Sequence, residues 1–404
     1  MDRQLGFLAG APRISTRPDA EMSGPRSRIL GLVKGFESLN WEVKPFIVGD
    51  QTPKKWSAMG SGKAISSGFF RTLAVDLVRL GLGVINTWRS WRELGHQVDW
   101  VYEYTATLQC LGWIFKQRGI PWILQTEALL FYEAKAERKA LVLDGLARWL
   151  EISAYRSCDV LACVSETLKE ILIRDFNIPS EKIVLVPNAV DTDFIDPKRH
   201  QQKRIFTGFT IGFVGSLYAW AGLDLLLDAM SELRDQGLDL SLVVVGDGAM
   251  KDIWKNHAQQ LGLSSYVAFI GQVPWSDVPQ YISGFDVGYS GQVPLQMGKM
   301  YLSPMKLYEY MAMAKPVVAS AFEDAQRLVF EGKTGFLFRP GDKDDLKRAL
   351  VEAFAHRSLL SEMGCMARQE IETHHSWQAR VQVLVEGVEQ ILKQRSSIKA
   401  TLER

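Results

Sequence analysis

Two charged residues, Lys306 and Glu309, lie three positions apart in the otherwise apolar segment SPMKLYEYMAMA, residues 303–314. A helix that is apolar on every side belongs in a protein interior, where a charge without a partner costs several kcal/mol. A surface ion pair is one interpretation, but lysine before glutamate is the poorer orientation, and such a pair contributes only about 0.2–0.5 kcal/mol. We favour the other interpretation, a bound polar ligand. Ser303 and Pro304 suit the cap and first turn of this helix.

Glycines follow two strand-like runs in the second half of the chain. In IGFVGSLYAWAGLDLLLDAM, Gly215 and Ser216 end a strand and Gly222 precedes a helix. Such a loop lets backbone amides and a helix N-terminus face an anionic group such as a phosphate, although glycines end many strands. VVVGDGAM repeats the pattern with Gly246 and Gly248, where a structural turn is the simpler interpretation.

The elements that must hold these residues alternate along the chain. Apolar runs predict strands at 5–10, 42–49, 99–104, 121–126, 159–165 and 182–188, and again at 210–216, 240–248, 266–272, 286–291, 315–320 and 334–338. Helical patterns between them predict parallel sheets covered on both faces. We expect an α/β protein of two Rossmann-like domains, 1–195 and 196–376, with a last helix in 377–404 that packs back toward the first domain. Ligands of such sheets bind outside the carboxyl ends of the strands, so we expect a site in the cleft between the domains.

Composition excludes several classes of protein. The 404 residues are 47% hydrophobic and 23% charged, as in soluble globular proteins, and the net charge of +1 gives no argument for binding nucleic acid. The four cysteines have no metal or redox spacing, and the six histidines form no ligand pattern, so we expect no metal. The early apolar run 72–88 is interrupted by Asp76 and Arg79 and fails as a membrane span, and no signal peptide is evident. We expect a cytoplasmic protein.

Residues 54–92 combine basic and aromatic side chains. The basic residues are Lys54, Lys55, Lys63, Arg71, Arg79, Arg89 and Arg92, against Asp76 alone, and the interleaved aromatic residues are Trp56, Phe69, Phe70, Trp88 and Trp91. Such a stretch is typical of contact with an anionic membrane surface. Alternatively, its aromatic residues belong to the core and its cations form a solvated face; the sequence favours neither interpretation.

An ordered series of segments resembles the motif string of family 4 glycosyltransferases, which have the GT-B fold. The segments are VYEY, GIPWILQTEALL, EISAYRSCDVLACVSETL, KIVLVPNAVDTDF, IGFVGSLYAWAGLDLLLDA, VVVGDG, SPMKLYEYMAMAKPVVAS and GKTGFLFRPGD. The resemblance implies a retaining transferase that moves a sugar from a nucleotide donor without a metal. It implies that Glu309 holds the ribose hydroxyls and that Lys306 could meet the diphosphate. The expected donor site comprises Gly24, Gly215, Ser216, Gly222, Gly246, Gly248, Ser303, Pro304, Lys306 and Glu309.

The chain departs from the family pattern at several of these positions. A second glutamate usually lies eight residues before the first, where this chain has Tyr301. Many members have arginine at the position of Ser216 and lysine at that of Ala221, so three polar contacts to the donor are missing. Many also have histidine at the position of Glu127, whose carboxylate could orient a hydroxyl of the acceptor or donor, or could simply end a strand. Gly24 could admit close approach of a ligand or belong to a simple helix cap.

We therefore expect a glycosyltransferase of surface polysaccharide or glycolipid assembly, located in the cytoplasm or peripherally at the inner face of the membrane. Its co-substrate would be a UDP-, GDP- or ADP-sugar and its acceptor a glycan or a lipid-linked sugar, with no permanently bound cofactor. Glu127 and Lys306 are the candidate catalytic residues. A sugar-nucleotide epimerase of the same fold and a catalytically silent sugar-nucleotide-binding protein are the alternatives. A pair of NAD-binding domains is disfavoured, since no GxGxxG follows a strand with an acidic partner.

Overall fold

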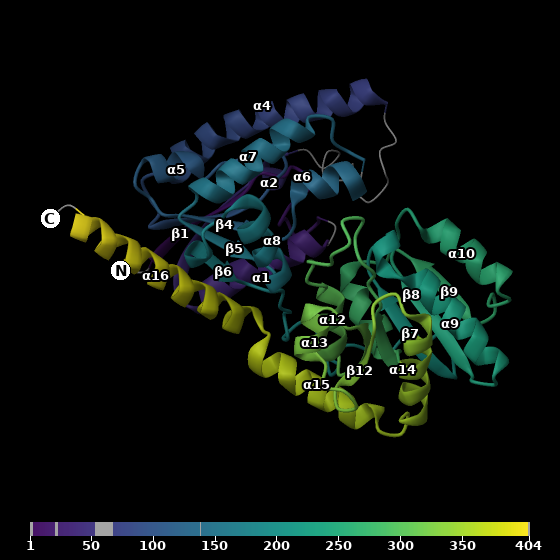
Figure 1. Ribbon diagram of the computed structural model, residues 1–404. Helices are drawn as coiled ribbons and strands as arrows, with labels where there is room; N and C mark the ends of the chain where they lie inside the picture. Colours follow the sequence, from purple (N-terminus) through teal and green to yellow (C-terminus); the bar gives the residue numbers. More distant parts are fainter. Residues whose placement is uncertain (1–2, 21–22, 53–67, 138, 403–404) are drawn as a thin grey trace. The chain divides into compact units, whose positions relative to one another are not determined.

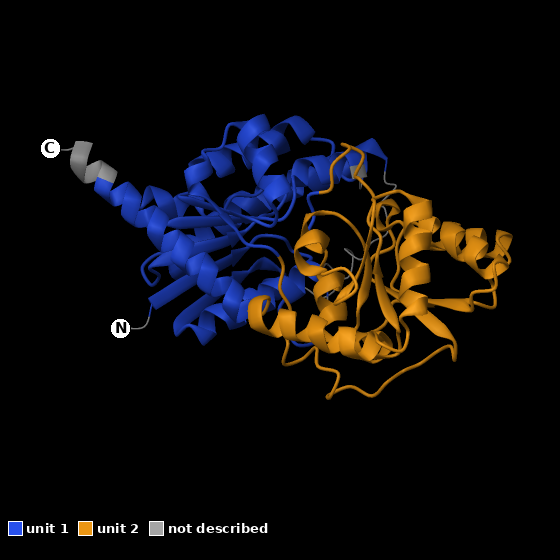
Figure 2. Cartoon of the chain, turned by 60° about the horizontal axis from the view of Figure 1, so that its bottom comes forward, with its two compact units in different colours: residues 1–187, 301–303, 377–404 blue, residues 188–300, 304–376 orange. Residues whose placement is uncertain are grey.

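The computed structural model describes the chain except for residues 1–2, 21–22, 53–67, 138 and 403–404 (Figure 1). The chain divides into two compact units, coloured separately in Figure 2. Unit 1 comprises Met1–Pro187, Tyr301–Ser303 and Trp377–Arg404, and unit 2 comprises Asn188–Met300 and Pro304–Ser376. The units part at residues 187 and 188, where the sequence suggested 195 and 196.

Unit 1 is a parallel sheet with helices on both faces. Its elements are β1 (Arg3–Ala9), α1 (Gly24–Ser38), β2 (Trp41–Ile47), α2 (Val48–Gln51), α4 (Phe69–Leu94), β3 (Trp100–Tyr104), α5 (Trp113–Gln117), β4 (Trp122–Thr126), α6 (Leu130–Tyr132), η2 (Glu133–Glu137), α7 (Asp144–Ser157), β5 (Val160–Cys163), α8 (Glu166–Phe176), η3 (Ser180–Lys182), β6 (Ile183–Leu185) and α16 (Trp377–Leu402). The strand order is β2-β1-β3-β4-β5-β6, and every pair is parallel.

The last helix, α16, packs on α1. Two glycines on one face of α1, Gly31 and Gly35, make room for it: a Cβ on Gly31 would lie 2.2 Å from Nε1 of Trp377, and one on Gly35 would lie 2.5 Å from a methyl group of Val381. Val381, Leu384 and Val388 of α16 are buried. The chain thus returns after unit 2 to complete the core of unit 1.

Unit 2 has the same construction. Its elements are β7 (Phe209–Val214), η4 (Ala219–Ala221), α9 (Leu223–Asp235), β8 (Leu240–Val245), α10 (Lys251–Gln260), β9 (Val267–Gly271), η5 (Trp275–Asp277), α11 (Val278–Ser283), β10 (Val287–Ser290), α12 (Met305–Ala312), β11 (Val317–Ser320), α13 (Glu323–Leu328), β12 (Gly335–Phe338), α14 (Lys343–Ala355) and α15 (Leu360–His374). The strand order is β12-β11-β10-β7-β8-β9, again parallel throughout.

Alternating residues of the unit 2 strands face two separate cores. Leu242 and Val244 belong to a cluster with α9, α10 and α14, whereas Val243 and Val245 belong to a cluster with α11, α12 and α15. Strands buried on both faces appear in the sequence as continuous apolar runs. All twelve predicted strands are present, and the predicted fold class, an α/β chain with two Rossmann-like sheets, is confirmed.

Candidate functional site

The strand order of unit 2 identifies where a ligand would bind. From β7 the chain continues outward through β8 and β9, whereas β10, on the other side of β7, leads to β11 and β12. In doubly wound sheets ligands bind outside the carboxyl ends of the strands at this point of reversal. Gly215 directly follows β7, and Gly291 directly follows β10. These two glycines mark the predicted binding edge of the sheet.

Lys306 lies at this edge. A Cβ on Gly215 would lie 3.4 Å from Nζ of Lys306, so the ammonium is next to the end of β7. The ammonium also lies 3.7 Å from the ring centroid of Phe213, in cation–π geometry. Lys306 is in the first turn of α12, and Glu309 follows three residues later on the same side of the helix.

Lys306 and Glu309 are half-buried, and among the described residues they interact only with each other, through the attraction of their charges, and with the ring of Phe213, which the Lys306 ammonium contacts. Within the described residues, the side chains of Lys306 and Glu309 make no hydrogen bond and no ion pair shorter than 4 Å. Burial lowers the pKa of Lys306 to about 7, and burial raises the pKa of Glu309 to about 7, with the attraction between the two charges opposing both shifts. Burying each charge costs free energy, and a ligand with an anionic group for Lys306 and hydroxyl donors for Glu309 would offset it.

The rest of α12 is apolar because it is core. Tyr308, Tyr310 and Met311 are fully buried in the cluster beneath β10 and β11. The hydroxyl of Tyr310 accepts a hydrogen bond of 2.7 Å from the backbone N–H of Val214, which ties α12 to β7. The cap position of α12 falls on Pro304, one residue later than the sequence predicted, and the predicted capping residue, Ser303, is buried in unit 1.

Tyr301, at the position where the family usually has its first glutamate, is not accessible to a ligand in unit 1. Tyr301 is fully buried in unit 1, and its backbone carbonyl accepts a hydrogen bond of 2.7 Å from the hydroxyl of Ser165. Burial raises the pKa of this phenol well above its ordinary value. Tyr301 is therefore a packed aromatic residue.

The glycine loops of unit 2 pack against one another. A Cβ on Gly246 would lie 1.9 Å from the carbonyl oxygen of Gly215, and a Cβ on Gly248 would lie 2.5 Å from the carbonyl oxygen of Leu217. These contacts give Gly246 and Gly248 a structural reason to be glycine, because they let the loop after β8 support the loop after β7. Ser216 is exposed in that supported loop.

Both the backbone conformation and the close packing at position 222 require glycine. It is the N-cap of α9 with φ +63°, a left-handed conformation, and a Cβ there would lie 2.0 Å from the carbonyl oxygen of Gly291. It thus joins the N-terminus of α9 to the residue that follows β10. The helix N-terminus carries a partial positive charge that favours anions.

We predict that Gly222→Ala lowers the free energy of unfolding by about 2 kcal/mol or more, because it adds left-handed strain and a backbone clash. Gly237→Ala is the matched control: Gly237 has φ +93°, but a Cβ there would meet nothing within 4 Å. Urea unfolding of both variants measures the difference. If both variants lose the same free energy of unfolding, the close approach of Gly222 to Gly291 does not contribute to the effect.

In unit 1, Glu127 follows β4 and is held by two buried partners. Its carboxylate pairs with Nε of Arg28 at 2.7 Å and accepts a hydrogen bond from the hydroxyl of Tyr104. Arg28 is fully buried, donates to the carbonyl oxygen of Val186 at 2.8 Å, and lies 5.6 Å from the ring of Trp377. Burial and the Glu127 charge raise the pKa of Tyr104 well above its ordinary value. Glu127 is therefore a fixed carboxylate.

Removal of Glu127 should destabilise the fold. Glu127→Ala leaves a buried guanidinium without its counter-ion, and we expect a loss of about 3 kcal/mol in the free energy of unfolding, measured in urea. The control is Glu166→Ala, which breaks the surface pair of Glu166 with Lys169 at 3.2 Å and should cost less than about 1 kcal/mol. Similar losses for both variants would contradict a structural role of the Arg28–Glu127 pair.

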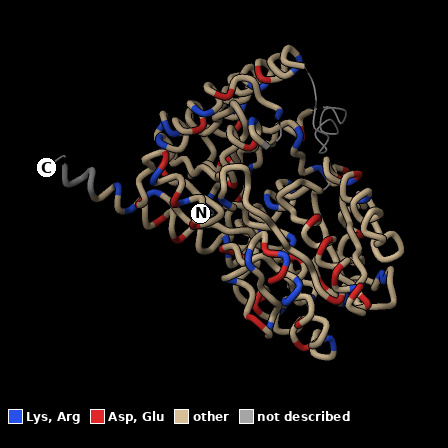
Figure 3. Tube along the Cα trace, turned by 45° about the vertical axis from the view of Figure 1, so that its right-hand side comes forward, with Lys and Arg blue, Asp and Glu red and all other residues tan. Residues whose placement is uncertain are grey.

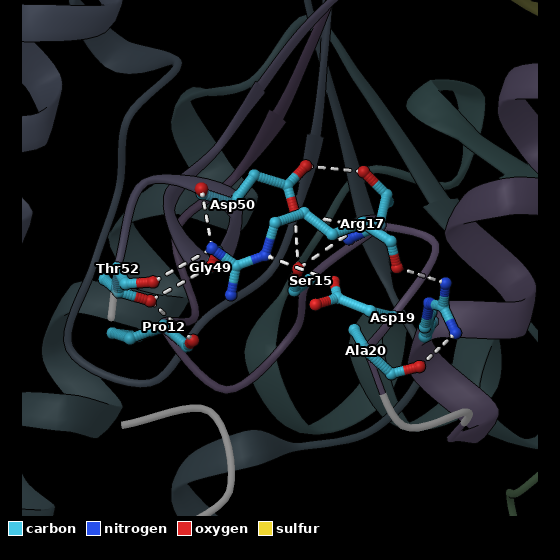
Figure 4. A network of polar contacts seen from close by, with 10 residues as sticks. Pro12, Ser15, Arg17, Asp19, Ala20, Gly49, Asp50 and Thr52 are labelled. Atoms are coloured by element: carbon cyan, nitrogen blue, oxygen red, sulfur yellow. Dashed lines mark hydrogen bonds and ion pairs between the residues drawn. The ribbon is translucent and has the colours of Figure 1, made fainter. Parts of the chain in front are cut away.

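The loop after β1 is tied down by Asp50 (Figure 4). The carboxylate of Asp50 accepts hydrogen bonds from the hydroxyl of Ser15 at 2.6 Å and from the backbone N–H of Thr16 at 2.7 Å, and Arg17 donates to the backbone carbonyl of Asp50 at 3.1 Å. The strand order of unit 1 reverses between β1 and β3, so this loop also lies at a carboxyl edge where ligands bind. This role of Asp50 was not foreseen from the sequence, although an acidic residue directly after the predicted strand 42–49 is a pattern that could have indicated it.

Gly24 begins α1. Ser23 is its N-cap and accepts a hydrogen bond from the backbone N–H of Arg26 at 3.4 Å. The cap and turn foreseen for this segment are therefore present, and the role of Gly24 toward a ligand stays a prediction.

The residues of the basic aromatic stretch divide into three groups. Lys54, Lys55, Trp56 and Lys63 lie outside the described residues. Phe69, Phe70 and Trp88 are exposed, as are Arg71, Arg89 and Arg92. Trp91 instead packs inward, with its ring centroid 5.4 Å from that of Phe115 and 5.4 Å from the guanidinium of Arg118. For Trp91, the core interpretation is the one that applies.

In the part of the chain that the structure describes, no group of three or more His, Cys, Asp or Glu side chains could hold a metal ion. The Lys306 ammonium and the N-terminus of α9 are two positive groups at this edge of the sheet.

Known proteins resemble both units. The family model described as Glycosyltransferase Family 4 matches residues 24–194, and the model described as Glycosyl transferases group 1 matches residues 208–356. The chain is 25% identical over 253 residues to mannosylfructose-phosphate synthase of Agrobacterium fabrum, covering 59% of this chain and 54% of that protein. It is 26% identical over 265 residues to UDP-Gal:alpha-D-GlcNAc-diphosphoundecaprenol alpha-1,3-galactosyltransferase of Escherichia coli, covering 63% and 65%. The matches thus span less than two thirds of these relatives.

The fold as a whole has a close counterpart among solved structures. Sucrose-phosphate synthase from Thermosynechococcus elongatus aligns with a TM-score of 0.71 over 98% of this chain and 100% of that chain, at 17% identity. The two family models, which between them match most of both units, show that the chain belongs to the family 4 glycosyltransferases, and the structural match shows that it has the GT-B fold.

Proposed function

We propose that the protein is a retaining glycosyltransferase that moves a sugar from a nucleotide-diphosphate-sugar to a glycan or lipid-linked acceptor without a metal. One observation carries the proposal. An ammonium and a carboxylate, half-buried and without hydrogen-bonding partners among the described residues, lie at the edge of unit 2 where doubly wound sheets bind ligands.

The proposed roles follow from the chemistry of the two groups. The Glu309 carboxylate accepts hydrogen bonds from the two ribose hydroxyls of the nucleotide. The Lys306 ammonium faces the diphosphate and stabilises the negative charge that develops there as the bond from the anomeric carbon to the diphosphate breaks. The acceptor hydroxyl forms the new bond on the same face of the sugar, and its proton passes to the departing diphosphate.

The N-terminus of α9 and the loop after β7 are proposed to support the phosphates. Ser216 and Ala221 offer no cation there, so backbone N–H groups and the partial charge of a 13-residue helix would take that role. Gly215 and Gly222 would allow the diphosphate to come close to the backbone. In unit 1, Gly24 and the fixed carboxylate of Glu127 are proposed to orient the substrates.

A screen of nucleoside diphosphates tests the proposal directly. UDP, GDP and ADP would each be added to the full chain, and the unfolding temperature would be measured, since a ligand that binds the native state raises it by mass action. We expect one base to stabilise the protein well beyond the others, and the matching UDP-, GDP- or ADP-sugar to be the donor. If none of the three shifts the unfolding temperature at millimolar concentration, the donor assignment is wrong.

A silent sugar-nucleotide-binding protein is the second candidate, and the non-charged residues Ser216, Ala221 and Tyr301 favour it. The two functions differ in turnover. An enzyme slowly hydrolyses its nucleotide-sugar or transfers the sugar to an added acceptor, and free nucleotide appears. A silent protein binds the same compound and releases it unchanged.

We propose that the enzyme works in the cytoplasm or at the inner face of the membrane.

A further inference from the structure

Helix α4 of unit 1 is amphipathic, but its polar face is buried and its apolar face is exposed. Its buried residues are mostly polar or small: Thr72, Asp76, Gly83, Asn86, Ser90 and Leu94. Its exposed residues include eight large apolar side chains: Phe69, Phe70, Val75, Leu77, Val78, Val84, Ile85 and Trp88. In an ordinary surface helix of a globular protein the apolar stripe faces the core. The apolar stripe of α4 faces outward.

Specific contacts hold the polar face of α4 inward. Asp76 is fully buried and accepts hydrogen bonds from the backbone N–H groups of Val142 and Leu143, at 2.8 and 3.1 Å. Arg79 pairs with Asp76 at 2.9 Å and donates to the carbonyl oxygen of Ala140 at 3.1 Å. These bonds join α4 to the segment that leads into α7. A rotation of α4 that buried its apolar stripe would break the bonds to Ala140, Val142 and Leu143 and leave Asp76 with Arg79 of the same helix as its ion-pair partner.

The apolar stripe is long and continuous. Phe70, Leu77 and Val84 recur every seven residues, and Trp88 follows four residues later, so these side chains share one side of the helix. Phe70 is 83% exposed and Val84 is 66% exposed. A helix of 26 residues is about 39 Å long. Figure 1 shows α4 along the outside of unit 1.

The charges beside this stripe are positive. Arg71, Arg89 and Arg92 are exposed on α4, and Glu93 is its only exposed acidic residue within the described part of the chain. Figure 3 marks the basic and acidic positions along the chain. No described helix is both long enough and apolar enough to cross a membrane, and this one carries four arginines. Aromatic and aliphatic side chains bordered by arginines suit the boundary between lipid headgroups and acyl chains.

We propose that α4 lies in the plane of an anionic membrane, with Phe70, Leu77, Val84, Ile85 and Trp88 inserted below the headgroups and Arg71, Arg89 and Arg92 among the lipid phosphates. This surface goes beyond the reaction proposed above, since membrane binding needs neither donor nor acceptor. It rests on the proposed function only for its purpose, which is to bring unit 1 to a lipid-linked acceptor. Leu77, Val84 and Ile85 were not foreseen from the sequence.

Vesicle binding tests the proposal. The full chain would be sedimented with vesicles of phosphatidylglycerol and phosphatidylcholine, and with phosphatidylcholine alone, at low and high salt. We expect binding to the anionic vesicles that weakens with salt and is on the order of tenfold weaker on the neutral ones. Leu77→Asp with Val84→Asp should lower the partition coefficient on the order of tenfold or more, and Arg71→Glu with Arg92→Glu should do the same.

Two matched controls separate this surface from exposure in general. Ile253→Asp changes an aliphatic residue of α10 that is 57% exposed, and Lys255→Glu reverses an exposed charge on the same helix. Both should leave vesicle binding unchanged. The Leu77 and Val84 variant should keep the circular dichroism and the nucleotide affinity of the wild type, so a failure of the donor proposal would not be mistaken for a failure of this one.

Three results would overturn the proposal: no binding of the wild type to anionic vesicles, equal binding to neutral vesicles at all salt concentrations, or equal losses in the α10 controls. If the wild type instead forms a concentration-dependent dimer that the Leu77 and Val84 substitutions dissociate, and does not bind vesicles, the apolar stripe belongs to a second copy of the chain.

Discussion

Glu309→Gln is expected to weaken the binding of the nucleoside diphosphate by about 10- to 100-fold while the protein stays folded. A hydrogen bond to a charged acceptor contributes about 1.5–3 kcal/mol, and the amide that replaces the carboxylate has only one acceptor oxygen for two ribose hydroxyls. Folding should survive because the substitution removes a half-buried charge whose pKa burial raises to about 7. Titration calorimetry with the nucleotide that stabilises the wild type measures the loss.

The matched control is Glu362→Gln on α15, where an exposed glutamate loses its charge. Its affinity for the nucleotide should equal that of the wild type. A Glu309→Gln variant that binds as tightly as the control would show that Glu309 does not hold the ribose, and the donor site would have to be sought elsewhere in unit 2.

The fold could be predicted because each strand is indicated by a pattern of neighbouring residues in the sequence. VVV in β8 and VVA in β11 are apolar on both faces, as strands covered on both sides must be, and such strands appear in the sequence as short apolar runs. The Lys306 and Glu309 pair could be found for the same reason: both charges lie within two turns of one helix whose other residues, such as Tyr310, are core. Local spacing was sufficient information.

Contacts between distant parts of the chain could not be predicted in this way. Nothing near Glu127 in the sequence indicates that Arg28 and Tyr104 hold its carboxylate, because each comes from another element of unit 1. Helix α4 shows the same limit. Periodicity separates its apolar face from its polar face, but the choice of the buried face depends on Asp76 meeting the backbone of Val142 and Leu143. That choice belongs to tertiary structure.

Lys306→Met is expected to lower the turnover number for transfer or donor hydrolysis by about 10²–10³-fold. The ammonium lies beside the end of β7, and a methionine of similar length fills the space without the charge that the departing diphosphate needs. Lys306→Arg keeps a positive charge and should retain part of the activity. Steady-state rates of nucleotide release measure both variants, and a Lys306→Met enzyme with wild-type turnover would remove Lys306 from the mechanism.

The pH dependence of nucleotide binding gives this assignment a second, independent test. Burial lowers the pKa of Lys306 to about 7, so in the ligand-free protein the ammonium loses its proton as the pH rises above 7. The diphosphate favours the protonated form, so affinity should fall as the pH rises from 7 to 9, by at most about tenfold per pH unit. Glu309 gains its charge near the same pH, which favours the ribose contact and opposes this trend. The fall should therefore be clearest in Glu309→Gln and should vanish in Lys306→Arg, because a guanidinium keeps its proton throughout this range. If nucleotide affinity falls between pH 7 and 9 as steeply in Lys306→Arg as in the wild type, another group is responsible for the pH dependence. The ammonium beside β7 is then not the group that meets the diphosphate.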